Sequence, residues 1–401
     1  MSATQRTSFL RRLSLRLGLP LVGVLALVAG GLVLSTGCLA TLGGTPDPAR
    51  LVGLALQSRY ADGRFANLEA PSPPWTGERP SLVDVFFRGE RRRPLAELPL
   101  AEPGATWGEP PNDGARVTWL GHSTLLIEVD GARVLTDPIW SARASPSSLV
   151  GPVRFHPPPV PLAALPKLDA VVISHDHYDH LDMDTVQALA KTGVRFFVPL
   201  GVADHLRSWD VPDAQVVELD WWGEAPVTRD VSLVATPSRH YSGRTTGRRD
   251  TTLWASWVVR GARHRVFFSG DSGPTPQFED IGRRLGPFDL VALEIGAFHP
   301  AWGDIHLGPD NALEAHRMLG GGPLLPIHWA TFNLAVHPWD EPVERLVRLA
   351  AQRGVHVLMP MLGAPLVIEE GARLAPWWRS LGASRAASIR EGRPGVMEAQ
   401  R

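Results

Sequence analysis

The chain has 401 residues, of which 44% are hydrophobic, and its formal net charge is -1 at pH 7. This length allows one large domain or two ordinary ones, and the apolar fraction is that of a globular protein. A balanced charge without a long basic block argues against nucleic acid as a partner. The single cysteine, Cys38, excludes an internal disulfide framework and a zinc site built from thiolates.

The N-terminus has the composition of an export signal or a membrane anchor. Four arginines precede an apolar run at 17–34, and small residues separate this run from Cys38. The run is long enough to span a bilayer, and the arginines favour a cytoplasmic N-terminus. Residues 34–38 resemble a bacterial lipoprotein signal, in which the cysteine is acylated, although Ser35 stands where a leucine is commonest. We expect an exported, membrane-associated protein of the bacterial periplasm or cell surface. An uncleaved anchor, ordinary cleavage and a cytosolic protein are the alternatives.

Composition divides the chain into four parts. In order, these are a signal or anchor, an N-terminal extension, a main domain and a C-terminal tail, at 1–42, 43–112, 113–370 and 371–401. The extension is rich in Pro and polar residues, so we expect an irregular wrap or linker there. Tryptophan pairs at 221–222 and 377–378 are expected to pack in or on the main domain, and a lipid-facing role is the alternative.

The main domain alternates predicted strands with predicted helices. It opens with a hairpin, because Asp130-Gly131 lies between two apolar runs. A strand at 170–174, a helix at 183–191, a strand at 196–198 and a helix at 203–208 follow. This order predicts an α/β fold, in which side chains that follow the strands gather at one edge of the sheet.

Three histidines and two aspartates follow the strand at 170–174 within six residues. They include the ordered pattern His-x-His-x-Asp-His, formed by His175, His177, Asp179 and His180. Desolvating so many imidazoles and carboxylates is costly unless a divalent metal compensates for the lost water. A lone histidine would be interpreted as a hydrogen-bonded core residue, but this pattern predicts a metal-binding loop.

Three later strands also end in a candidate ligand, namely His240, Asp271 and His328. Taken singly, a histidine after a strand is a weak signal, but loops at one edge of a sheet can converge. His122 lies in a corner after the first strand, where bracing of the turn is the commoner role and metal ligation the alternative. Asp137, after the hairpin, either supports a ligand from behind or does not reach the site.

Together these motifs resemble the metallo-β-lactamase superfamily and, within it, N-acyl phosphatidylethanolamine phospholipase D and its bacterial relatives. The stretches that carry the resemblance are 63–67, 119–124, 175–182, 236–244, 252–257, 268–273 and 326–332. The resemblance covers about residues 55 to 370 and implies an αββα sandwich, with one catalytic domain and two metals, usually zinc, at one edge.

The resemblance also implies a role for each candidate residue. His175, His177 and His240 would hold one zinc, Asp179, His180 and His328 the other, and Asp271 would bridge the two. Asp179, Asp271 and His306 would be catalytic, with His306 contacting the phosphate; a structural role is the alternative for His306. Imidazoles and carboxylates suit zinc on chemical grounds too, although iron and manganese accept the same donors.

The expected activity is that of a phospholipase D-type phosphodiesterase acting on N-acyl phosphatidylethanolamine-like lipids through a hydroxide held between two metals. A lactonase or other small-ester hydrolase is the first alternative, and a metal-binding protein without catalysis is the second. The expected partners are a phospholipid or other small-molecule substrate and a membrane contacted through the N-terminus. The sequence leaves the acyl specificity and the oligomeric state open.

Overall fold

The computed structural model describes residues 38–70, 81, 91–108, 114–245, 247–299, 302, 305–368 and 376–381. The apolar run at 17–34 and most of the C-terminal tail therefore lie outside the described residues. None of the helices within the described ranges combines the length and the hydropathy of a bilayer-spanning segment.

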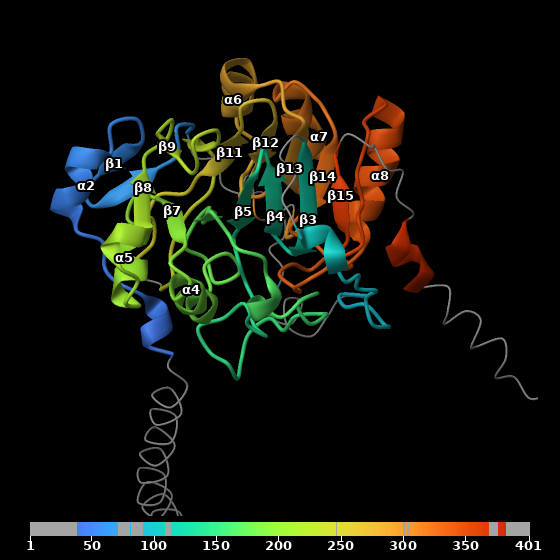
Figure 1. Ribbon diagram of the computed structural model, residues 1–401, viewed down its shortest axis with the longest axis horizontal. Coiled ribbons are helices and arrows are strands. Elements are labelled where there is room, and N and C mark those ends of the chain that lie inside the picture. Colours follow the sequence, from blue (N-terminus) through green and yellow to red (C-terminus); the bar gives the residue numbers. More distant parts are fainter. Residues whose placement is uncertain are drawn as a thin grey trace, which may run out of the picture.

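Two sheets form the centre of the molecule (Figure 1). The first has seven strands in the order β15-β3-β4-β5-β6-β7-β8, and the second has six in the order β14-β13-β12-β11-β10-β9. The strands of the first sheet are β3 (Ala115–Gly121), β4 (Thr124–Val129), β5 (Ala132–Thr136), β6 (Ala170–Val172), β7 (Arg195–Pro199), β8 (Val216–Leu219) and β15 (Pro365–Val367). Those of the second sheet are β9 (Glu224–Pro226), β10 (Ser232–Thr236), β11 (Ser256–Arg260), β12 (Arg265–Phe268), β13 (Leu290–Glu294) and β14 (Leu324–Ile327).

Each sheet mixes parallel and antiparallel pairs. Strands β3, β4 and β5 are antiparallel neighbours, whereas β5 through β8 run parallel, as do β12, β13 and β14. The predicted turn between β4 and β5 is confirmed, with φ of 45° at Asp130 and 86° at Gly131. Because parallel strands point the same way, the residues that follow β6, β12 and β14 leave their sheets at carboxyl edges.

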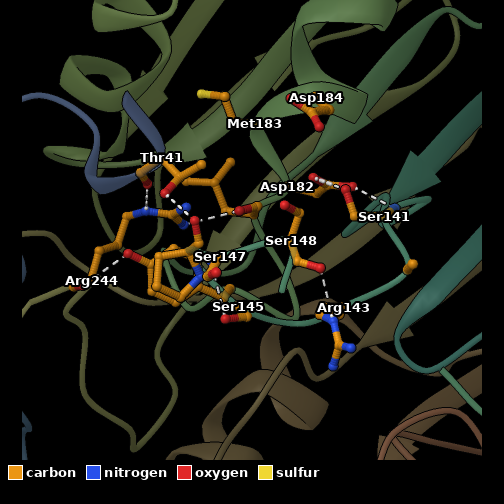
Figure 2. A pocket seen from close by; sticks show the side chains of 14 residues that line it. Thr41, Ser141, Arg143, Ser145, Ser147, Ser148, Asp182, Met183, Asp184 and Arg244 are labelled. Atoms are coloured by element: carbon orange, nitrogen blue, oxygen red, sulfur yellow. Dashed lines mark hydrogen bonds between the residues drawn. The ribbon is translucent and has the colours of Figure 1, made fainter. Parts of the chain in front are cut away.

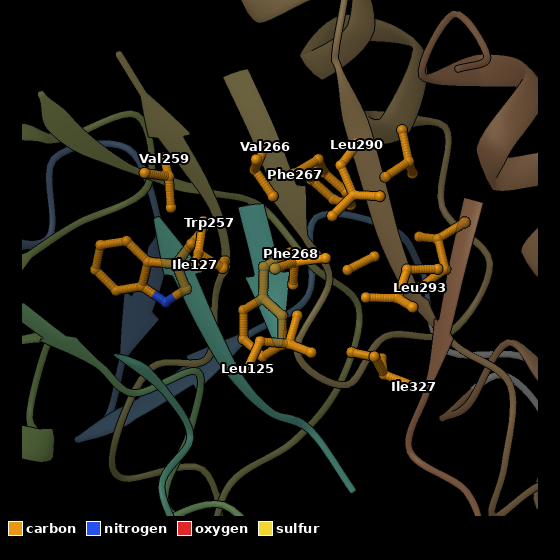
Figure 3. Packing of buried hydrophobic residues seen from close by; sticks show 14 of the residues in the cluster. Leu125, Ile127, Trp257, Val259, Val266, Phe267, Phe268, Leu290, Leu293 and Ile327 are labelled. Atoms are coloured by element: carbon orange, nitrogen blue, oxygen red, sulfur yellow. The ribbon is translucent and has the colours of Figure 1, made fainter. Parts of the chain in front are cut away.

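The core lies between the two sheets and follows the period of two expected for strands. On β4, Leu125 and Ile127 face the second sheet, whereas Leu126 belongs to a separate cluster on the outer face. Figure 3 shows this inner layer, in which Leu125 and Ile127 lie against Phe268 of β12 and its neighbours on the second sheet. The alternation explains why every residue of β4 is buried: both faces of the strand are covered.

Helices cover the outer face of each sheet. The first sheet is covered by α4 (Met183–Ala190) and α5 (Val202–Ser208), whose Val186, Leu189 and Leu206 pack in the outer cluster. The second sheet is covered by α6 (Gln277–Leu285), α7 (Gly308–Met318) and α8 (Glu341–Arg353). The predicted helices at 183–191 and 203–208 are thus confirmed to within a residue. The layers form the expected αββα sandwich.

Part of the N-terminal extension is regular, so the prediction of an irregular wrap is wrong there. It contains α2 (Pro48–Leu54) and a hairpin of β1 (Arg59–Ala61) and β2 (Arg64–Ala66), and η1 (Ala40–Leu42) lies just before it. These elements are held by a few strong contacts. Leu51 and Phe65 are buried in the core, and Arg50 lies 2.5 Å from Asp204 and also pairs with Glu218. Elements this short show too little periodicity to be predicted.

The tryptophan pairs contribute to packing, as expected. Trp377 and Trp378 lie in η6 (Trp377–Arg379), each with its ring centroid 5.6 Å from that of Trp329. Trp221 is buried, and the guanidinium of Arg284 lies 3.7 Å from the ring centre of Trp222. The indoles therefore pack within the sandwich or under a cation.

Candidate metal centre

The loop after β6 is held in place by a buried carboxylate, that of Asp137. Asp137 lies just after β5 and is fully buried. Its Oδ1 accepts a hydrogen bond from the backbone N–H of Ser174 at 2.7 Å, and its Oδ2 accepts from Ser174 Oγ at 2.6 Å and from His180 Nδ1 at 2.7 Å. Asp137 thus reaches the site and supports a ligand from behind, which was one of the two predicted possibilities.

The first group of candidate ligands joins the loop to the second sheet. His175, His177, His240 and Asp271 each offer a ligand atom, and these atoms lie within 4.8 Å of one another. His177 Nδ1 is 2.8 Å from His175 Nε2 and 3.3 Å from His240 Nε2. The predicted set His175, His177 and His240 is therefore brought together, although 65 positions separate His175 from His240 in the sequence.

The second group lies beside the first and has one member that the predicted ligand set lacks. Asp179, His180 and His328 gather with His122, and their ligand atoms again lie within 4.8 Å of one another. Asp179 Oδ2 is 3.3 Å from His180 Nε2, 3.4 Å from His328 Nε2 and 2.9 Å from His122 Nε2. The sequence interpretation favoured a turn-bracing role for His122, and its backbone does brace the turn, since its carbonyl accepts from the N–H of His328 at 3.0 Å.

Asp271 lies between the two groups. Its Oδ1 is 3.2 Å from His180 Nε2 and 3.1 Å from His328 Nε2, in the second group. Its Oδ2 is 3.8 Å from His175 Nε2 and 3.7 Å from His240 Nε2, in the first group. One carboxylate therefore presents one oxygen to each group, which is the arrangement that a bridging ligand requires.

The histidines are oriented by contacts on their far nitrogen. Nδ1 of His240 donates to the carbonyl of Ile305 at 2.8 Å, and Nδ1 of His180 donates to Asp137. Nδ1 of His175 lies 2.9 Å from Ser174 Oγ. In all three residues the Nε2 atom is left for the centre of its group. Hydrogen bonding of the distal imidazole nitrogen is the usual way in which proteins orient metal-binding histidines.

The donor atoms fit divalent cations. Nε2 of His180, Nε2 of His328 and Oδ1 of Asp271 are buried, and none has a hydrogen-bond partner within the described part of the chain. Oδ1 of Asp271 nevertheless lies 3.2 Å from Nε2 of His180 and 3.1 Å from Nε2 of His328, without the alignment of a hydrogen bond. Buried polar atoms that converge without pairing are costly unless something satisfies them, and imidazole with carboxylate is a suitable donor set for zinc.

The charges of the site follow from burial and from these neighbours. Burial and the adjacent imidazoles lower the pKa of His175 well below its usual range, so this ring is neutral. For His328, burial acts to lower the pKa, but the carboxylates of Asp271 and Asp179 outweigh it and raise the pKa to about 10. Burial acts to raise the pKa of Asp271, but the imidazoles of His180 and His328 outweigh it and hold this pKa well below the usual range. Cation binding at this site would displace protons from His328, since the metal competes for the same lone pair.

A further buried carboxylate, that of Glu294 at the end of β13, was missed by the sequence analysis. Its Oε2 accepts from His306 Nδ1 at 2.7 Å, and its Oε1 accepts from the N–H groups of Ser272 and Leu307 at 2.9 and 3.1 Å. Glu294 therefore joins the loop that carries Asp271 to the loop that carries His306. The signal that could have revealed it was a fifth apolar strand ending in an acidic residue.

His306 faces the site and is directed by Glu294. Burial acts to lower its pKa, but the charge of Glu294 and the hydrogen bond with it prevail, so the pKa of His306 is raised. Because the carboxylate can only accept, Nδ1 carries a proton and Nε2 is left for a ligand. The predicted catalytic residues Asp179, Asp271 and His306 all line the same cavity.

The cavity above the two groups has a volume of about 460 Å³. Its polar floor includes His177, Asp179, Asp271 and His328. Aromatic and aliphatic residues form much of the remaining lining, namely Ala144, Tyr178, Tyr241, Ala297, Trp302, Ile305 and Leu334. A concave site with a few convergent polar groups and an apolar wall is typical of a small-molecule or lipid-binding site.

Known proteins resemble this chain in sequence and in fold. Residues 132–329 match the beta-lactamase superfamily domain. An uncharacterized protein of Mycobacterium tuberculosis is 50% identical over 373 residues, which are 88% of this chain and 98% of that protein. The N-acyl-phosphatidylethanolamine-hydrolyzing phospholipase D 1 of Caenorhabditis elegans is 36% identical over 252 residues, which are 60% of this chain and 71% of the relative.

A solved structure, that of a possible metal-dependent hydrolase from Veillonella parvula, superposes with a TM-score of 0.51 at 15% identity. The match covers 64% of this chain and all of that one, 100%. This likeness shows the fold. With the sequence matches and the two convergent groups of imidazoles and carboxylates, it leads to one conclusion: the chain belongs to the metallo-β-lactamase superfamily of metal-dependent hydrolases and is related to N-acyl-phosphatidylethanolamine-hydrolyzing phospholipase D.

Proposed function

We propose that this protein is a zinc-dependent phospholipase D-type phosphodiesterase that hydrolyses N-acylated phosphatidylethanolamine or a closely related phospholipid. The observation that carries the proposal is the position of Asp271, which presents one oxygen to each of two ligand groups on the floor of a cavity with an apolar wall. The nematode relative, named for hydrolysis of that lipid, supports the choice of substrate class.

We assign two zinc ions per chain to the two groups. His175, His177 and His240 would hold one ion, Asp179, His180 and His328 would hold the other, and Asp271 would offer one oxygen to each. We assign His122 to Asp179 instead of a metal. Burial and the proximity of His328 lower the pKa of His122 to about 3, so its ring is neutral and Nε2 donates to the carboxylate. In this role His122 orients Asp179.

When bound, the two cations activate water at neutral pH and offset the negative charge that gathers on the phosphate oxygens. Asp179 and Asp271 line the cavity floor, where their carboxylates orient the attacking water. The water, which gives up one proton to the solvent on activation, forms a bond from its oxygen to phosphorus as the bond from phosphorus to the ethanolamine oxygen breaks. His306, protonated because Glu294 raises its pKa, donates its Nε2 proton to that leaving oxygen. The products are an N-acylethanolamine and phosphatidate.

The lining of the cavity supports a lipid substrate. Tyr178, Tyr241, Trp302, Ile305 and Leu334 give the cavity an aromatic and aliphatic wall beside the ionic floor. Such a wall favours an acyl chain, because the burial of apolar surface stabilises the complex. A lactone or other small ester without an acyl chain, as in the alternative function, would gain little from it.

Export and attachment to a membrane are also part of the proposal. They rest on the basic residues and the apolar run before Cys38, which lie outside the described residues. A chain attached to a bilayer would meet a lipid substrate in the plane of the membrane.

The proposal is tested with the full chain in vesicles that contain N-palmitoyl phosphatidylethanolamine. We expect mass spectrometry to find N-palmitoylethanolamine and phosphatidate in equal amounts, with loss of activity after chelation and recovery with zinc. A parallel panel of lactones addresses the first alternative. Lactone hydrolysis without release of N-palmitoylethanolamine would overturn the substrate, and absence of hydrolysis with fewer than one metal per chain would favour a non-catalytic metal-binding protein.

A further inference from the structure

The residues that directly follow Cys38 are packed into the catalytic domain. Trp209 Nε1 donates a hydrogen bond to the carbonyl of Ala40 at 2.7 Å, and Arg244 Nε donates to the carbonyl of Thr41 at 2.8 Å. Figure 2 shows Thr41 beside the guanidinium of Arg244, at the edge of a polar pocket. This short segment is therefore fixed within three residues of Cys38.

Two glycines tighten the same attachment. A Cβ atom on Gly43 would lie 2.3 Å from Nδ1 of His205, and one on Gly44 would lie 2.1 Å from the carbonyl oxygen of Asp204. Arg248 also donates to the carbonyls of both glycines at 3.2 Å. Only residues without a side chain allow the backbone to approach α5 so closely. Residues 40–44 are consequently part of the domain surface and do not form a flexible linker.

Arg244, which binds this segment, also binds the proposed metal-binding loop. NH1 of Arg244 donates to the carbonyls of Asp176 and Leu181 at 2.7 and 2.9 Å, on the two sides of the ligands His177, Asp179 and His180. Arg244 is buried, and its guanidinium stacks 4.0 Å from the ring centre of Tyr178, which lines the catalytic cavity. The segment after Cys38 and the metal-binding loop thus share one support.

A surface loop at 144–152 touches the same segment and carries an exposed apolar tip. Thr41 Oγ1 donates to the carbonyl of Pro146 at 3.1 Å. Beyond that contact, Leu149 and Val150 are 51% and 66% exposed, and Leu39 on the N-terminal side is 58% exposed. Three large apolar side chains therefore face solvent on two segments that contact each other.

The base of this loop forms part of the catalytic cavity. Ala144 lines that cavity, and its N–H closes the loop by donating to the carbonyl of Pro152 at 3.1 Å. Arg143 reinforces the loop by donating to the carbonyls of Ser148 and Gly151 at 3.0 and 2.7 Å. The apolar tip is consequently held by a defined loop whose base is a wall of the substrate site.

The position of the apolar run limits how far this surface can lie from a bilayer. The run ends at Leu34, and the backbone is fixed to the domain from Ala40 onward. Six residues of fully extended chain span at most about 22 Å. A chain anchored at 17–34 or through Cys38 must hold the surface beside Leu39 near the lipid headgroups.

We propose that Leu39, Leu149 and Val150 form a bilayer-contact edge that inserts among the headgroups and turns the cavity wall at Ala144 and Tyr178 toward the lipid. The inference rests on the membrane attachment included in the proposed function. The occupant of the edge is a phospholipid bilayer. A lipid would move from the bilayer into the cavity along the loop without crossing bulk water.

The first test uses the full chain in vesicles of phosphatidylethanolamine and phosphatidylglycerol, with the photoreactive residue benzoyl-phenylalanine at one position. At position 149 we expect crosslinks to lipid. Val52 on α2 is the matched control, because it is an apolar residue with 68% exposure on a different element. The bilayer-contact edge would be contradicted if position 52 were crosslinked to lipid and position 149 were not, or if both were crosslinked equally. It would also be contradicted if position 149 were crosslinked to a second copy of the chain.

The second test compares L149D/V150D with the control V52D/L54D on two substrates. Loss of two apolar contacts with the bilayer should lower the rate on vesicles of N-palmitoyl phosphatidylethanolamine about tenfold or more in L149D/V150D only. The rate on soluble bis(p-nitrophenyl) phosphate should stay unchanged in both variants, which also shows that they fold. Equal rates on vesicles for the wild type and L149D/V150D would overturn the edge. If the wild type hydrolyses neither phosphodiester, the proposed function fails. The crosslinking experiment still tests the bilayer-contact edge, because it does not depend on activity.

Discussion

The first sheet supplies four of the proposed ligands from one loop of six residues after β6, whereas the second sheet supplies one side chain from each of three separate strand ends. The shape of the loop is fixed from one side, because Asp137 binds both Ser174, just before the loop, and His180 at its end. His240, Asp271 and His328 come together only when β10, β12 and β14 are in place. Metal affinity should therefore report on the tertiary structure of the second sheet more than on that of the loop.

Removal of Asp271, which both groups of candidate ligands share, should have the largest effect on metal binding and turnover. Asp271→Ala deletes the carboxylate that faces both ligand groups. We expect less than one metal per chain and a loss of turnover of roughly a thousandfold, since metal-assisted charge stabilisation contributes several kcal/mol. Plasma emission spectrometry and the vesicle assay measure the two effects. Asp213→Ala, at a carboxylate with 77% side-chain exposure, is the control. Two metals per chain in Asp271→Ala would show that each group of ligands binds its metal without Asp271.

His306→Ala separates catalysis from metal binding within the second half. His306 contacts Glu294 and lines the cavity, but it belongs to neither proposed ligand set. We expect turnover to fall about a hundredfold, as for the loss of a general acid, with two metals retained. Steady-state kinetics and metal analysis of the same sample give both values. Loss of a metal would contradict the role assigned to His306.

Asp137→Asn tests how far the loop depends on its own support. The amide replaces one of the two carboxylate oxygens that receive Ser174 and His180. Removal of a supporting hydrogen bond behind a metal ligand typically lowers metal affinity by roughly 10–100-fold. Competition with a chelator measures this affinity directly. An unchanged affinity would indicate that the second half alone fixes His180.

The two halves also meet at a glycine, which gives a test based on stability. Gly270 has φ of 55°, and a Cβ on it would lie 2.4 Å from Cβ of Ser174. Gly193 has φ of 81° but nothing within 4 Å of such a Cβ. We expect Gly193→Ala to cost about 1 kcal/mol of unfolding free energy for the left-handed backbone, and Gly270→Ala to cost about 1–3 kcal/mol more for overpacking. Equal losses in urea denaturation would show that the two loops do not press on each other.

Glu294→Gln should have the smallest effect and a characteristic pH dependence. The charge of Glu294 helps to raise the pKa of His306, and the neutral amide would let that pKa fall. Because the protonated ring is the active form, activity is lost as pH rises through this pKa, so the alkaline limb should move to lower pH. Turnover near neutral pH should fall about tenfold with both metals bound. If the alkaline limb of the pH–activity profile did not move, Glu294 would not set the pKa of the catalytic His306.

The difference between the halves also explains what the sequence could predict. His175, His177, Asp179 and His180 form a contiguous pattern that indicates metal binding on its own. The later His240, Asp271 and His328 were predicted because each follows an apolar strand, and the resemblance to the superfamily gave them an order. The structure brings all seven together, and their role as metal ligands stays a prediction.

Other features of the site depend on distances that no local pattern encodes. Glu294 ends an apolar strand, which is a local signal, but its pairing with His306 is not encoded locally because His306 lies 12 residues away on a different loop. The contact of His122 with Asp179 spans 57 residues, so the sequence showed only its turn. The sequence gives no sign that residues 40–44 are attached to the domain, because the attachment consists of backbone carbonyls that accept hydrogen bonds from distant arginine and tryptophan side chains.

The central claim is that the two groups of candidate ligands, which meet at Asp271, hold two divalent cations. Anomalous X-ray scattering at the zinc edge, from crystals of the full chain purified with zinc, tests this claim most directly. We predict two peaks, one among His175, His177 and His240 and one among Asp179, His180 and His328, with Asp271 between them. A single peak, or two peaks that do not share Asp271, would contradict the account.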